Sequence, residues 1–437
     1  MSGSTQGDTV EPGGQPMGHA TLRGRRFLVF WSAQTTSKFG SAMTVVVMPL
    51  IAVQSLNASP FLIGVLEAAA WLPWLAIGLV AGAWVDRMSR WRVMILGDVV
   101  SALLFASVPV AAWLGVLSVW HLLTVALLAG AVSVLYSTAY DAYLPSLVPS
   151  GDLAGANSRL QGTEKIAQVA GPSFGGLIVQ VAGAVPALVI DAITFVVSAI
   201  CVWTLREDAR SPRQGRGERA VRLRTEIAQG LAHVWSDRYL RSLTAYAAAS
   251  NLAMGALQAV LVVFLAREAG LGAATIGVAL GSIGVGGVLG AVSAPGLSRW
   301  LGSARAIVLC EVVAMPFALL IPLTGTGTAV AFLIVGGAVV SAGVVAPNVL
   351  SATFLQTSCP PSMLGRVSAS TRVINYSTLP AGTLAGGALG SLAGLRPAMW
   401  IITAGLTACT AILLCGPLPR VRDLPVRLTG ASGERST

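Results

Sequence analysis

The stretch "GAWVDRMSRWRV" (residues 82–93) places one acid and three arginines between two long apolar segments. The segments are "FLIGVLEAAAWLPWLAIGLVA" (61–81) before it and "MILGDVVSALLFASVPVAAWLGVL" (94–117) after it. A helix needs about 20 apolar residues to cross a membrane, and both segments are long enough. The stretch is therefore expected to be a charged loop between two membrane-spanning helices.

The composition of the whole chain points to lipid as its solvent. Of the 437 residues, 54% are hydrophobic and only 11% are charged, whereas a soluble protein carries about 25% charged residues. So few charges cannot cover a water-exposed surface. The chain is therefore expected to be an integral membrane protein.

Apolar segments of spanning length recur twelve times, with turn-forming residues or charges between them. They begin near residues 27, 60, 92, 120, 158, 185, 241, 274, 305, 328, 367 and 397. The apolar runs are continuous, whereas the strands of a transmembrane barrel alternate with a period of two. We therefore predict an all-α integral membrane fold with twelve transmembrane helices.

The positions of the basic residues test this count. If the helices alternate and both termini are cytoplasmic, 25 of the 28 lysines and arginines fall on the inner side. Arg267 and Arg396 fall outside, and Lys38 lies within the first helix. This sorting follows the positive-inside rule and predicts a multi-pass protein of the cell membrane. For the basic loops, topology and contact with anionic lipids are favoured over nucleic-acid binding.

Residues that could carry redox, metal or nucleotide chemistry are sparse. Five cysteines lie in or beside apolar segments and are interpreted as small apolar fillers, namely Cys201, Cys310, Cys359, Cys409 and Cys415. The three histidines are isolated, and neither lysine follows a Gly-x-x-x-x-Gly stretch that could bind phosphate. We expect no metal and no cofactor, and we keep a membrane-embedded enzyme only as a remote alternative.

The chain divides into two weakly similar halves. "RVMILGDVV" (92–100) matches "RAIVLCEVV" (305–313), and in each an acid follows an arginine by six residues. The expected organisation is a disordered N-terminal segment (1–22), a six-helix half (23–205), a connector (206–240), a second six-helix half (241–416) and a tail (417–437). Many secondary transporters consist of two such halves, with the substrate site between them near the midplane.

Several stretches resemble the major facilitator superfamily. "GAWVDRMSRWRV" resembles the signature loop between its second and third helices, although the corresponding "GAVSAPGLSRW" (290–300) of the second half lacks the acid. "GPSFGG" (171–176) resembles the Gly-Pro motif of the superfamily's exporters, and "AYDAYLPSLVP" (139–149) also contributes to a similarity that covers essentially the whole chain. Within the superfamily, the chain looks most like the drug and siderophore exporter branch.

The resemblance implies the major facilitator fold and transport by alternating access. The expected activity is proton-coupled efflux of a small amphipathic molecule, such as a drug, an antibiotic, a siderophore or a metabolite, by a monomer. An uptake symporter of the same fold is the alternative.

The loop is interpreted as a conformational latch. Gly78, Gly82 and Asp86 share one face of the second helix, and small residues at this spacing permit another backbone to approach closely. In the superfamily fold the partner is the eleventh helix, which carries a comparable stripe of Gly382, Gly386, Gly390 and Gly394.

The charges of the loop are expected to complete this latch. Asp86 would accept hydrogen bonds from the N-terminus of the eleventh helix, whose partial charge is positive. Arg87, Arg90 and Arg92 would tether the loop to acids such as Asp98 and Asp141. A solvated connector without such a role is the alternative interpretation.

The exporter motif, Gly171, Pro172, Gly175 and Gly176, predicts a second hinge. Pro172 removes a helix hydrogen bond, and the glycines permit close helix packing. The glycines of the eighth helix are a plausible partner, namely Gly277, Gly281, Gly284 and Gly287. Close packing without motion is an equally compatible interpretation.

Five ionisable residues within the predicted helices are functional candidates, because charges inside a membrane are costly. They are Lys38, Glu67, Asp98, Asp191 and Glu311. We predict that Glu67 carries the coupling proton, since a desolvated carboxylate tends to stay protonated, and that Lys38 is a counter-charge or an anion contact. Asp98 and Glu311 are expected in cytoplasmic charge networks, and Asp191 is expected to be partly hydrated.

Tyrosines of the fourth helix are the remaining candidates. Tyr136, Tyr140 and Tyr143 form a stripe that suits either packing and interfacial anchoring or an aromatic wall for an amphipathic cargo. Polar contacts to the cargo are expected from amide side chains, namely Asn251, Gln258, Asn348 and Asn375.

Overall fold

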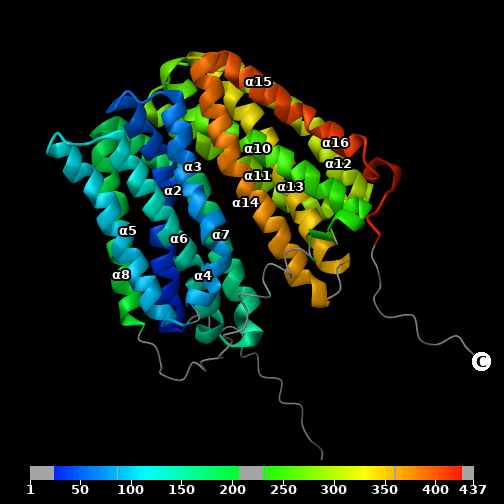
Figure 1. Cartoon of the computed structure of the whole chain (residues 1–437), viewed down its shortest axis with the longest axis horizontal. Helices are drawn as coiled ribbons and strands as arrows, with labels where there is room; N and C mark the ends of the chain where they lie inside the picture. Colours follow the sequence, from blue (N-terminus) through cyan, green and yellow to red (C-terminus); the bar gives the residue numbers. More distant parts are fainter. Residues whose placement is uncertain are drawn as a thin grey trace, which may run out of the picture.

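The computed structural model describes residues 24–85, 87–205, 229, 231–232, 234–358 and 361–425. All regular secondary structure in these ranges is helical, and Figure 1 shows a bundle of long helices. The helices of the first half are α2 (Arg25–Gln54), α3 (Pro60–Ala76), α4 (Gly78–Val85), α5 (Arg90–Trp113), α6 (Val119–Leu147), α7 (Leu153–Ala182) and α8 (Ala184–Thr204). Those of the second half are α10 (Arg238–Arg267), α11 (Ala273–Leu301), α12 (Ser303–Ala314), α13 (Val330–Ser358), α14 (Pro361–Leu392), α15 (Leu395–Ala408) and α16 (Thr410–Leu414).

The predicted all-helical fold of two six-helix halves is confirmed, and three of its twelve spans are composite. α3 and α4 form one span that is interrupted at Ile77, one turn after Pro73, where a proline removes a helix hydrogen bond. α12 continues as the 3-10 segment η2 (Met315–Leu323), which contains two prolines. α15 and α16 form the last span.

Nine of the described spans have the length and hydropathy of a membrane-crossing helix. α3 is apolar but has only 17 residues, and α4 extends it. α7 and α14 are long enough, with 30 and 32 residues, but are more polar. Both begin five to six residues before the predicted starts near 158 and 367, because their first turns carry polar residues that hydropathy does not detect.

Most helix packing occurs within each half, and two helix pairs make most of the contacts between the halves. α2 packs against α7 and α8, whereas α11 packs against α13 and α10 against α14. Between the halves, α7 packs along α11, and α3 packs along α14.

The two ends of the bundle differ in charge. We call the end at which α2, α5, α7, α10, α12 and α14 begin the basic end, because most described arginines lie there; in Figure 1 it faces the bottom for the first half and the lower right for the second half. Arg267 and Arg396 lie at the other end, which we call the opposite end. There Arg396 forms an ion pair with Glu268, with Nε and Oε1 3.1 Å apart.

The contacts between the halves are concentrated toward the opposite end. The backbone N–H of Phe61 donates to Ser391 Oγ at 2.9 Å, and Arg267 Nη2 donates to the carbonyl of Val53 at 3.5 Å. Gly64 of α3 faces the backbone of Gly387 on α14, so a side chain at Gly64 would overlap α14. The two halves are therefore closely joined at this end.

At the basic end, α4 does not share this close contact. The space beside Gly78 and Gly82, where a side chain would extend, holds no other described atom within 4 Å. Among the described residues, α4 packs mainly against α6 and α3, its neighbours in the same half. The halves are therefore joined at the opposite end and apart beside α4.

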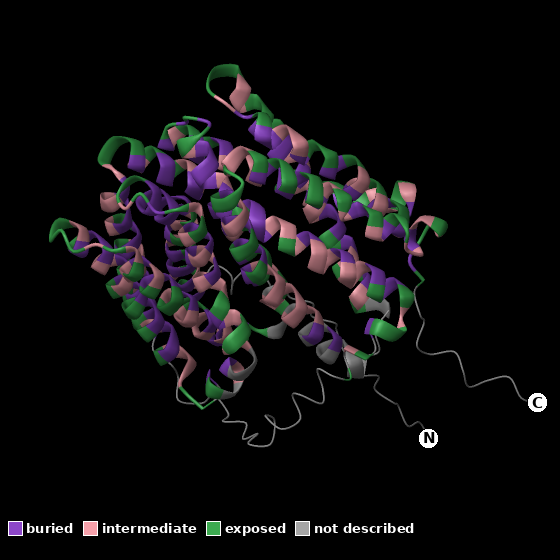
Figure 2. Ribbon diagram, turned by 45° about the horizontal axis from the view of Figure 1, so that its top comes forward, coloured by how far each residue is buried: buried purple, intermediate pink, exposed green. Residues whose placement is uncertain are grey.

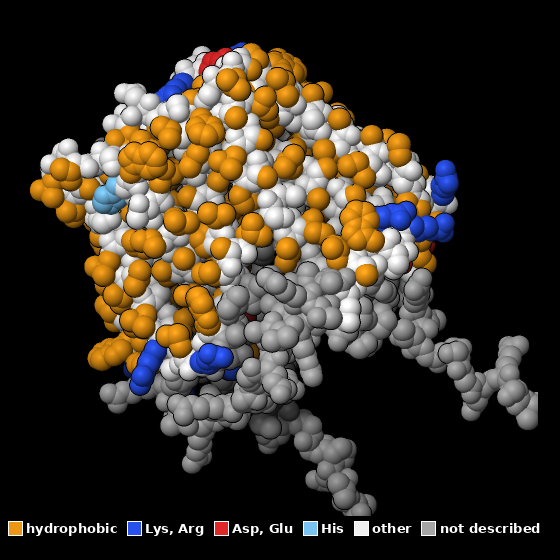
Figure 3. All heavy atoms as spheres, in the orientation of Figure 1, with side chains coloured by type: hydrophobic (Ala, Val, Ile, Leu, Met, Phe, Trp, Pro, Cys, Tyr) orange, Lys and Arg blue, Asp and Glu red, His pale blue; other side chains and the backbone are white. Residues whose placement is uncertain are grey.

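The flank of the bundle is apolar, as expected for a surface in lipid. Figure 3 shows hydrophobic side chains spread over the visible flank, with the charged side chains at its ends. Figure 2 shows buried and exposed residues alternating along single helices, so each helix has one face in the bundle and one outside. Large exposed side chains include Trp113, Trp120 and Trp300.

Candidate functional site

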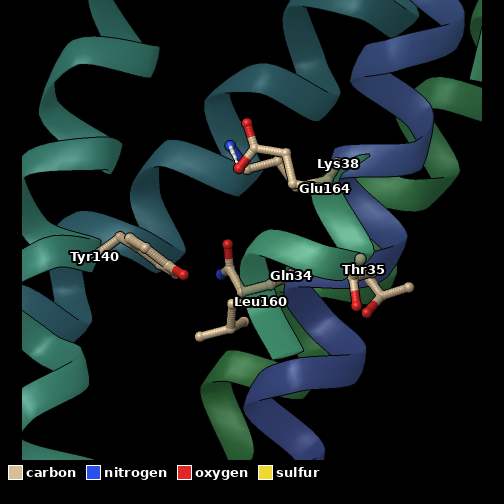
Figure 4. A pocket seen from close by; sticks show the side chains of 7 residues that line it. Gln34, Thr35, Lys38, Tyr140, Leu160 and Glu164 are labelled. Carbon is tan, nitrogen blue, oxygen red and sulfur yellow. Dashed lines mark ion pairs between the residues drawn. The ribbon is translucent and has the colours of Figure 1, made fainter. Parts of the chain in front are cut away.

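A small pocket lies between α2, α6 and α7. Its lining residues are Gln34, Thr35 and Lys38 of α2, Tyr140 of α6, and Leu160, Thr163 and Glu164 of α7. Figure 4 shows Gln34 extending between Tyr140 and the Lys38–Glu164 pair, with Leu160 on the other side of its amide. The pocket thus combines two opposite charges, an amide and an aromatic ring.

Lys38 and Glu164 form an ion pair in the middle of the bundle. Lys38 Nζ lies 3.5 Å from Glu164 Oε2, and the two side chains are 44% and 35% exposed. At 1.5 Å per residue, Lys38 lies about 20 Å along α2 and Glu164 about 17 Å along α7, each measured from the basic end of a helix of about 45 Å. A lone charge at this depth is costly in a bilayer, so the two side chains compensate each other.

The position of Glu164 on α7 explains why this pair is accessible. Towards the opposite end, Val169 and Ser173 of α7 lie against the glycines Gly281 and Gly284 of α11. Glu164 lies more than one helical turn closer to the basic end, and a side chain at the neighbouring Gly162 would meet no described atom within 4 Å. The pocket therefore lies on the side of the inter-half contact where the halves are apart.

Gln34 has a buried acceptor atom that no described donor reaches. The side chain is only 3% exposed, its Nε2 donates to the hydroxyl of Tyr136 at 2.5 Å, and its Oε1 has no hydrogen-bond partner. Leaving a buried acceptor unpaired costs about 1–3 kcal/mol. Such atoms in native proteins usually have a functional explanation or a bound molecule.

The hydrogen bonds continue from Gln34 into the first half. The hydroxyl of Tyr136 also interacts with that of Ser198 on α8. Ser198 Oγ donates to Asp98 Oδ2 at 2.7 Å, and Asp98 is only 1% exposed. A polar network of Gln34, Tyr136, Ser198 and Asp98 therefore connects the pocket with the core.

The placement of Asp98 differs from the expected cytoplasmic charge network. Its described hydrogen-bond partner is the hydroxyl of Ser198, and none of the described arginines forms an ion pair with it. Six residues turn an α-helix by about 600°, so Arg92 and Asp98 point to different faces of α5. Glu311 follows the same pattern, because it is buried on α12 and accepts a hydrogen bond from the hydroxyl of Tyr246 on α10.

Asp191 is buried, and the expected partial hydration is wrong. It is 1% exposed and accepts hydrogen bonds from the hydroxyls of Thr44 on α2 and Thr194 on its own helix. Gly40 makes this possible, since a side chain at that position would overlap Asp191 and Thr194. The close approach of α2 to α8 thus removes water from a group near a helix end.

Glu67 lies apart from the pocket. It is half-buried on α3, about 10 Å from the opposite end of that helix, and no hydrogen bond or ion pair joins it to another described residue. Gly64, one turn earlier, lies at the contact between α3 and α14. Glu67 therefore lies close to the contact that joins the halves.

The latch residues are only partly visible in the structure. Asp86 lies outside the described residues. Arg90 Nη1 donates to the backbone carbonyl of Ala142 on α6 at 2.7 Å, so this arginine holds the loop to a carbonyl group instead of the expected carboxylate. Arg87 and Arg92 are exposed.

The glycine stripe of the eleventh helix has two partners, and only one of them, α3, was expected. Gly382 and Gly386 face the backbone of Leu252 and Ala256 on α10, within the second half. Gly390 of the predicted stripe lies against Pro60 of α3, and Gly387, which was not part of that stripe, makes the close backbone contact with α3. The spacing of four identified a close-packing face, but it could not identify the helix that packs there.

The Gly-Pro motif joins α7 to two helices at once. Gly171 and Gly175 face Ala42 and Met43 of α2, whereas Gly176 faces the backbone of Gly277 on α11. As expected, Gly281 and Gly284 also face α7, but Gly287 faces α13. The hydroxyl of Ser173 donates to the carbonyl of Gly277 at 3.4 Å. The motif therefore lies at the contact between the halves.

The tyrosine stripe divides between packing and the pocket. Tyr143 is buried and its hydroxyl donates to the carbonyl of Leu205 at 3.2 Å. Tyr140 stacks on Phe30, with ring centroids 5.6 Å apart, and lines the pocket. In the second half, Asn251 Nδ2 donates to Asn375 Oδ1 at 3.1 Å, while Gln258 and Asn348 are exposed.

Glu164 and Gln34 are the pocket residues that the sequence analysis missed. Glu164 seemed to lie near the start of its helix, because the polar first turns of α7 hid about one and a half turns of helix. The depth of Glu164 could have been recognised if the polar residues before position 158 had been counted as part of the helix. Gln34 carried no charge and therefore did not stand out in an apolar helix.

The described cysteines and acids do not build a metal site. Among the residues that the structure describes, no cluster of three or more His, Cys, Asp or Glu side chains could hold a metal ion. Cys201, Cys310, Cys409 and Cys415 are free thiols, and Cys359 lies outside the described residues.

Comparison with known proteins adds four findings. Residues 17–427 match the sequence profile of a family described as "Transmembrane secretion effector". The multidrug efflux pump Tap of Mycolicibacterium fortuitum is 28% identical over 420 residues, which cover 92% of this chain and 98% of that protein. A mutant of the nucleoside transporter NupG has a similar fold, with a TM-score of 0.72 at 10% identity over 90% of this chain and 99% of that one. A bacterial Spinster homologue in an inward-facing, occupied conformation gives a TM-score of 0.67 at 15% identity, over 90% and 96% of the two chains.

Proposed function

The chain belongs to the transmembrane secretion effector family of the major facilitator superfamily, and from this membership we propose that it exports small amphipathic molecules in exchange for protons. The family and the fold make it a multi-pass secondary transporter. The name of the relative Tap, a multidrug efflux pump, supports export and a broad range of cargo.

The basic end is the cytoplasmic end in this proposal. Positive charges next to spanning helices are retained inside the cell, and the described arginines at this end include Arg25, Arg87, Arg92, Arg299 and Arg305. With this orientation, the halves are joined on the outer side and apart on the cytoplasmic side. The structure then corresponds to the state that receives cargo from the cytoplasm.

The pocket is the cargo site in this proposal. The observation that carries this assignment is the Lys38–Glu164 pair at mid-depth, with the unpaired acceptor of Gln34 beside it. Transporters with two halves bind their substrates near the midplane between those halves. The aromatic ring of Tyr140 and the side chain of Leu160 would contact the apolar part of an amphipathic molecule.

Glu67 is the proposed proton carrier. It is half-buried, has no described hydrogen-bond or ion-pair partner, and lies beside the contact that must open to the outside. A carboxyl group there would be desolvated while the outer contact is closed and hydrated once it opens, so that it could exchange its proton with the exterior.

Everted membrane vesicles test this function. Respiration acidifies their lumen, which corresponds to the cell exterior, and a pH-sensitive dye reports the gradient. Ethidium and other amphipathic compounds should accumulate in the lumen and release protons from it. Glu67→Gln vesicles should form the gradient but show neither response, while the purified variant should still bind ethidium.

A matched control is Glu268→Gln, which alters an acid at the opposite end that is paired with Arg396. This variant should transport like the unmodified protein. If Glu67→Gln still builds a cargo gradient from a pH step, Glu67 is not the carrier. If an acidic lumen instead drives cargo out of the vesicles together with protons, the protein is an uptake symporter.

A further inference from the structure

Glu164 has more capacity to accept hydrogen bonds than the structure uses. Its Oε2 lies 3.5 Å from Lys38 Nζ, and its Oε1 lies 3.5 Å from Gln168 Nε2. Charge-assisted hydrogen bonds are usually about 2.7–2.9 Å long, and a carboxylate has about four acceptor sites. Both contacts are therefore long, and the carboxylate can accept a further, closer donor.

The second open acceptor is Oε1 of Gln34. The Nε2 of this amide donates to the hydroxyl of Tyr136, which leaves Oε1 as the open acceptor. Its Oε1 is buried and has no partner, and the side chain lines the same pocket as Glu164. Two acceptors from α2 and α7 thus lie around one space.

Most hydrogen-bond donors that line the pocket already have an acceptor within the protein. The hydroxyl of Thr35 donates to the carbonyl of Trp31, and that of Thr163 donates to the carbonyl of Arg159. Lys38 is engaged with Glu164. An incoming group that satisfies this pocket must therefore supply donors and, opposite a carboxylate, positive charge.

The aromatic and apolar residues of the pocket could contact a cation that is attached to an apolar group. Tyr140 is stacked on Phe30 through one face of its ring, with an interplanar angle of 16°, and it lines the pocket together with Leu160. Aromatic rings attract cations that lie over their faces, and leucine offers an apolar surface. Figure 4 shows Tyr140 and the Glu164 carboxylate on different sides of Gln34.

We infer that this pocket recognises a protonated amine on the cargo, and that Lys38 is an internal competitor that occupies Glu164 until the cargo amine displaces it. The inference rests on the proposed export function for the identity of the ligand as cargo. When the pocket is empty, Lys38 neutralises Glu164 at mid-depth. When an amine binds, its N–H groups donate to Glu164 and to Gln34 Oε1.

Displacement of Lys38 is compatible with its surroundings. Its side chain is 44% exposed beside the region where the halves are apart. A lysine has a flexible four-carbon stem and a strongly hydrated ammonium group, so it can move from the carboxylate into water. No bond other than the ion pair holds its ammonium group among the described residues.

The test is a binding measurement with two matched fluorescent probes. Dansylcadaverine carries a primary ammonium group on an amphipathic body, and its N-acetyl derivative has the same body without the charge. The purified, detergent-solubilised full chain should bind the ammonium probe at least about tenfold more tightly, as expected for hydrogen bonds to a charged group. Fluorescence titration reports both dissociation constants.

Two variants separate the roles of the charged residues. Glu164→Gln keeps the shape of the carboxylate and should abolish the preference for the ammonium probe. Lys38→Met removes the competitor and should bind the ammonium probe roughly fivefold more tightly, the effect of losing a half-exposed ion pair. A gain in affinity cannot result from misfolding. Lys165→Met is the matched control, because it removes a neighbouring charge that bonds to Gln168 instead of Glu164.

Three results would overturn the inference. They are equal binding of the two probes to the unmodified protein, weaker ammonium binding by Lys38→Met, and no ammonium binding by either protein at millimolar probe. The assay does not depend on transport, so it separates the two proposals. Ammonium-selective binding without proton release from vesicles would retain the site and reject proton-coupled export.

Discussion

Asp98 is a buried acid that accepts a hydrogen bond from a single described hydroxyl group. Among the acids of the described spans, Asp98, Asp191 and Glu311 are almost fully buried against hydroxyl groups. Each of these three acids accepts its hydrogen bonds from donors in its own half of the protein. Glu67 and Glu164 are partly exposed and lie close to the region between the halves.

Ser198→Ala is therefore expected to lower the stability of the protein. The substitution removes a donor from the buried Asp98, and an unsatisfied buried group costs about 1–3 kcal/mol. The midpoint of thermal unfolding in detergent, followed by tryptophan fluorescence, should fall. The control is Ser32→Ala, an exposed position whose hydroxyl bonds only to the carbonyl of Val29 in the same helix. Equal midpoints for the two variants would contradict a stabilising role for the Ser198–Asp98 bond.

α7 contributes both to the contact with the second half and to the lining of the pocket. Its glycines pack against α2 and α11 in the part that lies towards the opposite end, and its Glu164 lines the pocket nearer to the basic end. A movement of α7 against α11 would therefore change the pocket and the inter-half contact together. A hinge at the Gly-Pro motif and close packing without motion, the two interpretations of the sequence, are both compatible with this arrangement.

Gly176→Ala should weaken the closed contact between α7 and α11. The added methyl group would overlap the backbone of Ala273 and Gly277, so the two helices must separate. Spin labels at the exposed residues Val181 and Thr275, at the opposite end of these helices, should show a longer or broader distance distribution. Gly162→Ala is the control on the same helix, because its methyl group would enter open space. Identical distributions in both variants would show that the contact tolerates the overlap.

The loop after α4 is a second element with a proposed conformational role. In the described state, α4 is not packed against a helix of the other half at Gly78 and Gly82. If the latch forms, it must therefore form in another state, in which the basic end is closed. Asp86 would then accept hydrogen bonds from the start of α14.

Asp86→Asn should shift the population toward the state that the structure describes. A charge at a helix N-terminus contributes roughly 0.3–2 kcal/mol, its hydrogen bonds add about 1.5–3 kcal/mol each, and about 1.4 kcal/mol changes an equilibrium tenfold. Spin labels at Met88 and Ser368 should report a longer mean distance than in the unmodified protein, with slower transport. Asp152→Asn, at the start of α7, is the control. Unchanged distances and transport would leave the loop as a topological connector.

The whole molecule is asymmetric along the membrane normal, in both charge and packing. The basic end carries most arginines and has the open space beside α4, whereas the opposite end holds the close contacts between the halves. The proposed direction of transport depends on which of these ends faces the cytoplasm.

Cysteine labelling tests this orientation. In a cysteine-free background, single cysteines at Ser211 and Ser432 should resist a membrane-impermeant maleimide added to intact cells, because both positions are expected inside. A cysteine at Val116, an exposed residue in the loop after α5 at the opposite end, should react readily. Labelling of Ser211→Cys or Ser432→Cys at the rate of Val116→Cys would reverse the topology and, with it, the assignment of the open side.

Hydropathy and charge were sufficient to predict the membrane fold and the twelve helices, whereas the superfamily was indicated by the resemblance of short motifs. These are local properties: a spanning helix satisfies its own backbone hydrogen bonds, so a segment of about 20 apolar residues specifies its structure almost independently of the rest of the chain. Gly171 and Gly176 were likewise recognisable as close-packing residues, because glycine spacing is visible in one helix.

Only the packing of the helices determines which side chains meet, and it therefore also determines which residues line the pocket. Lys38 and Glu164 are separated by 126 positions in the chain (164 − 38), and only the contact of α2 with α7 makes them a pair. The same holds for Asp191, which the approach of Thr44 removes from water, and for Gly382, which faces α10 instead of α3. The spacing of residues defines a helix face, but the neighbour of that face depends on the rotation and depth of the other helices, because an apolar helix surface can pack equally well against lipid or against another helix.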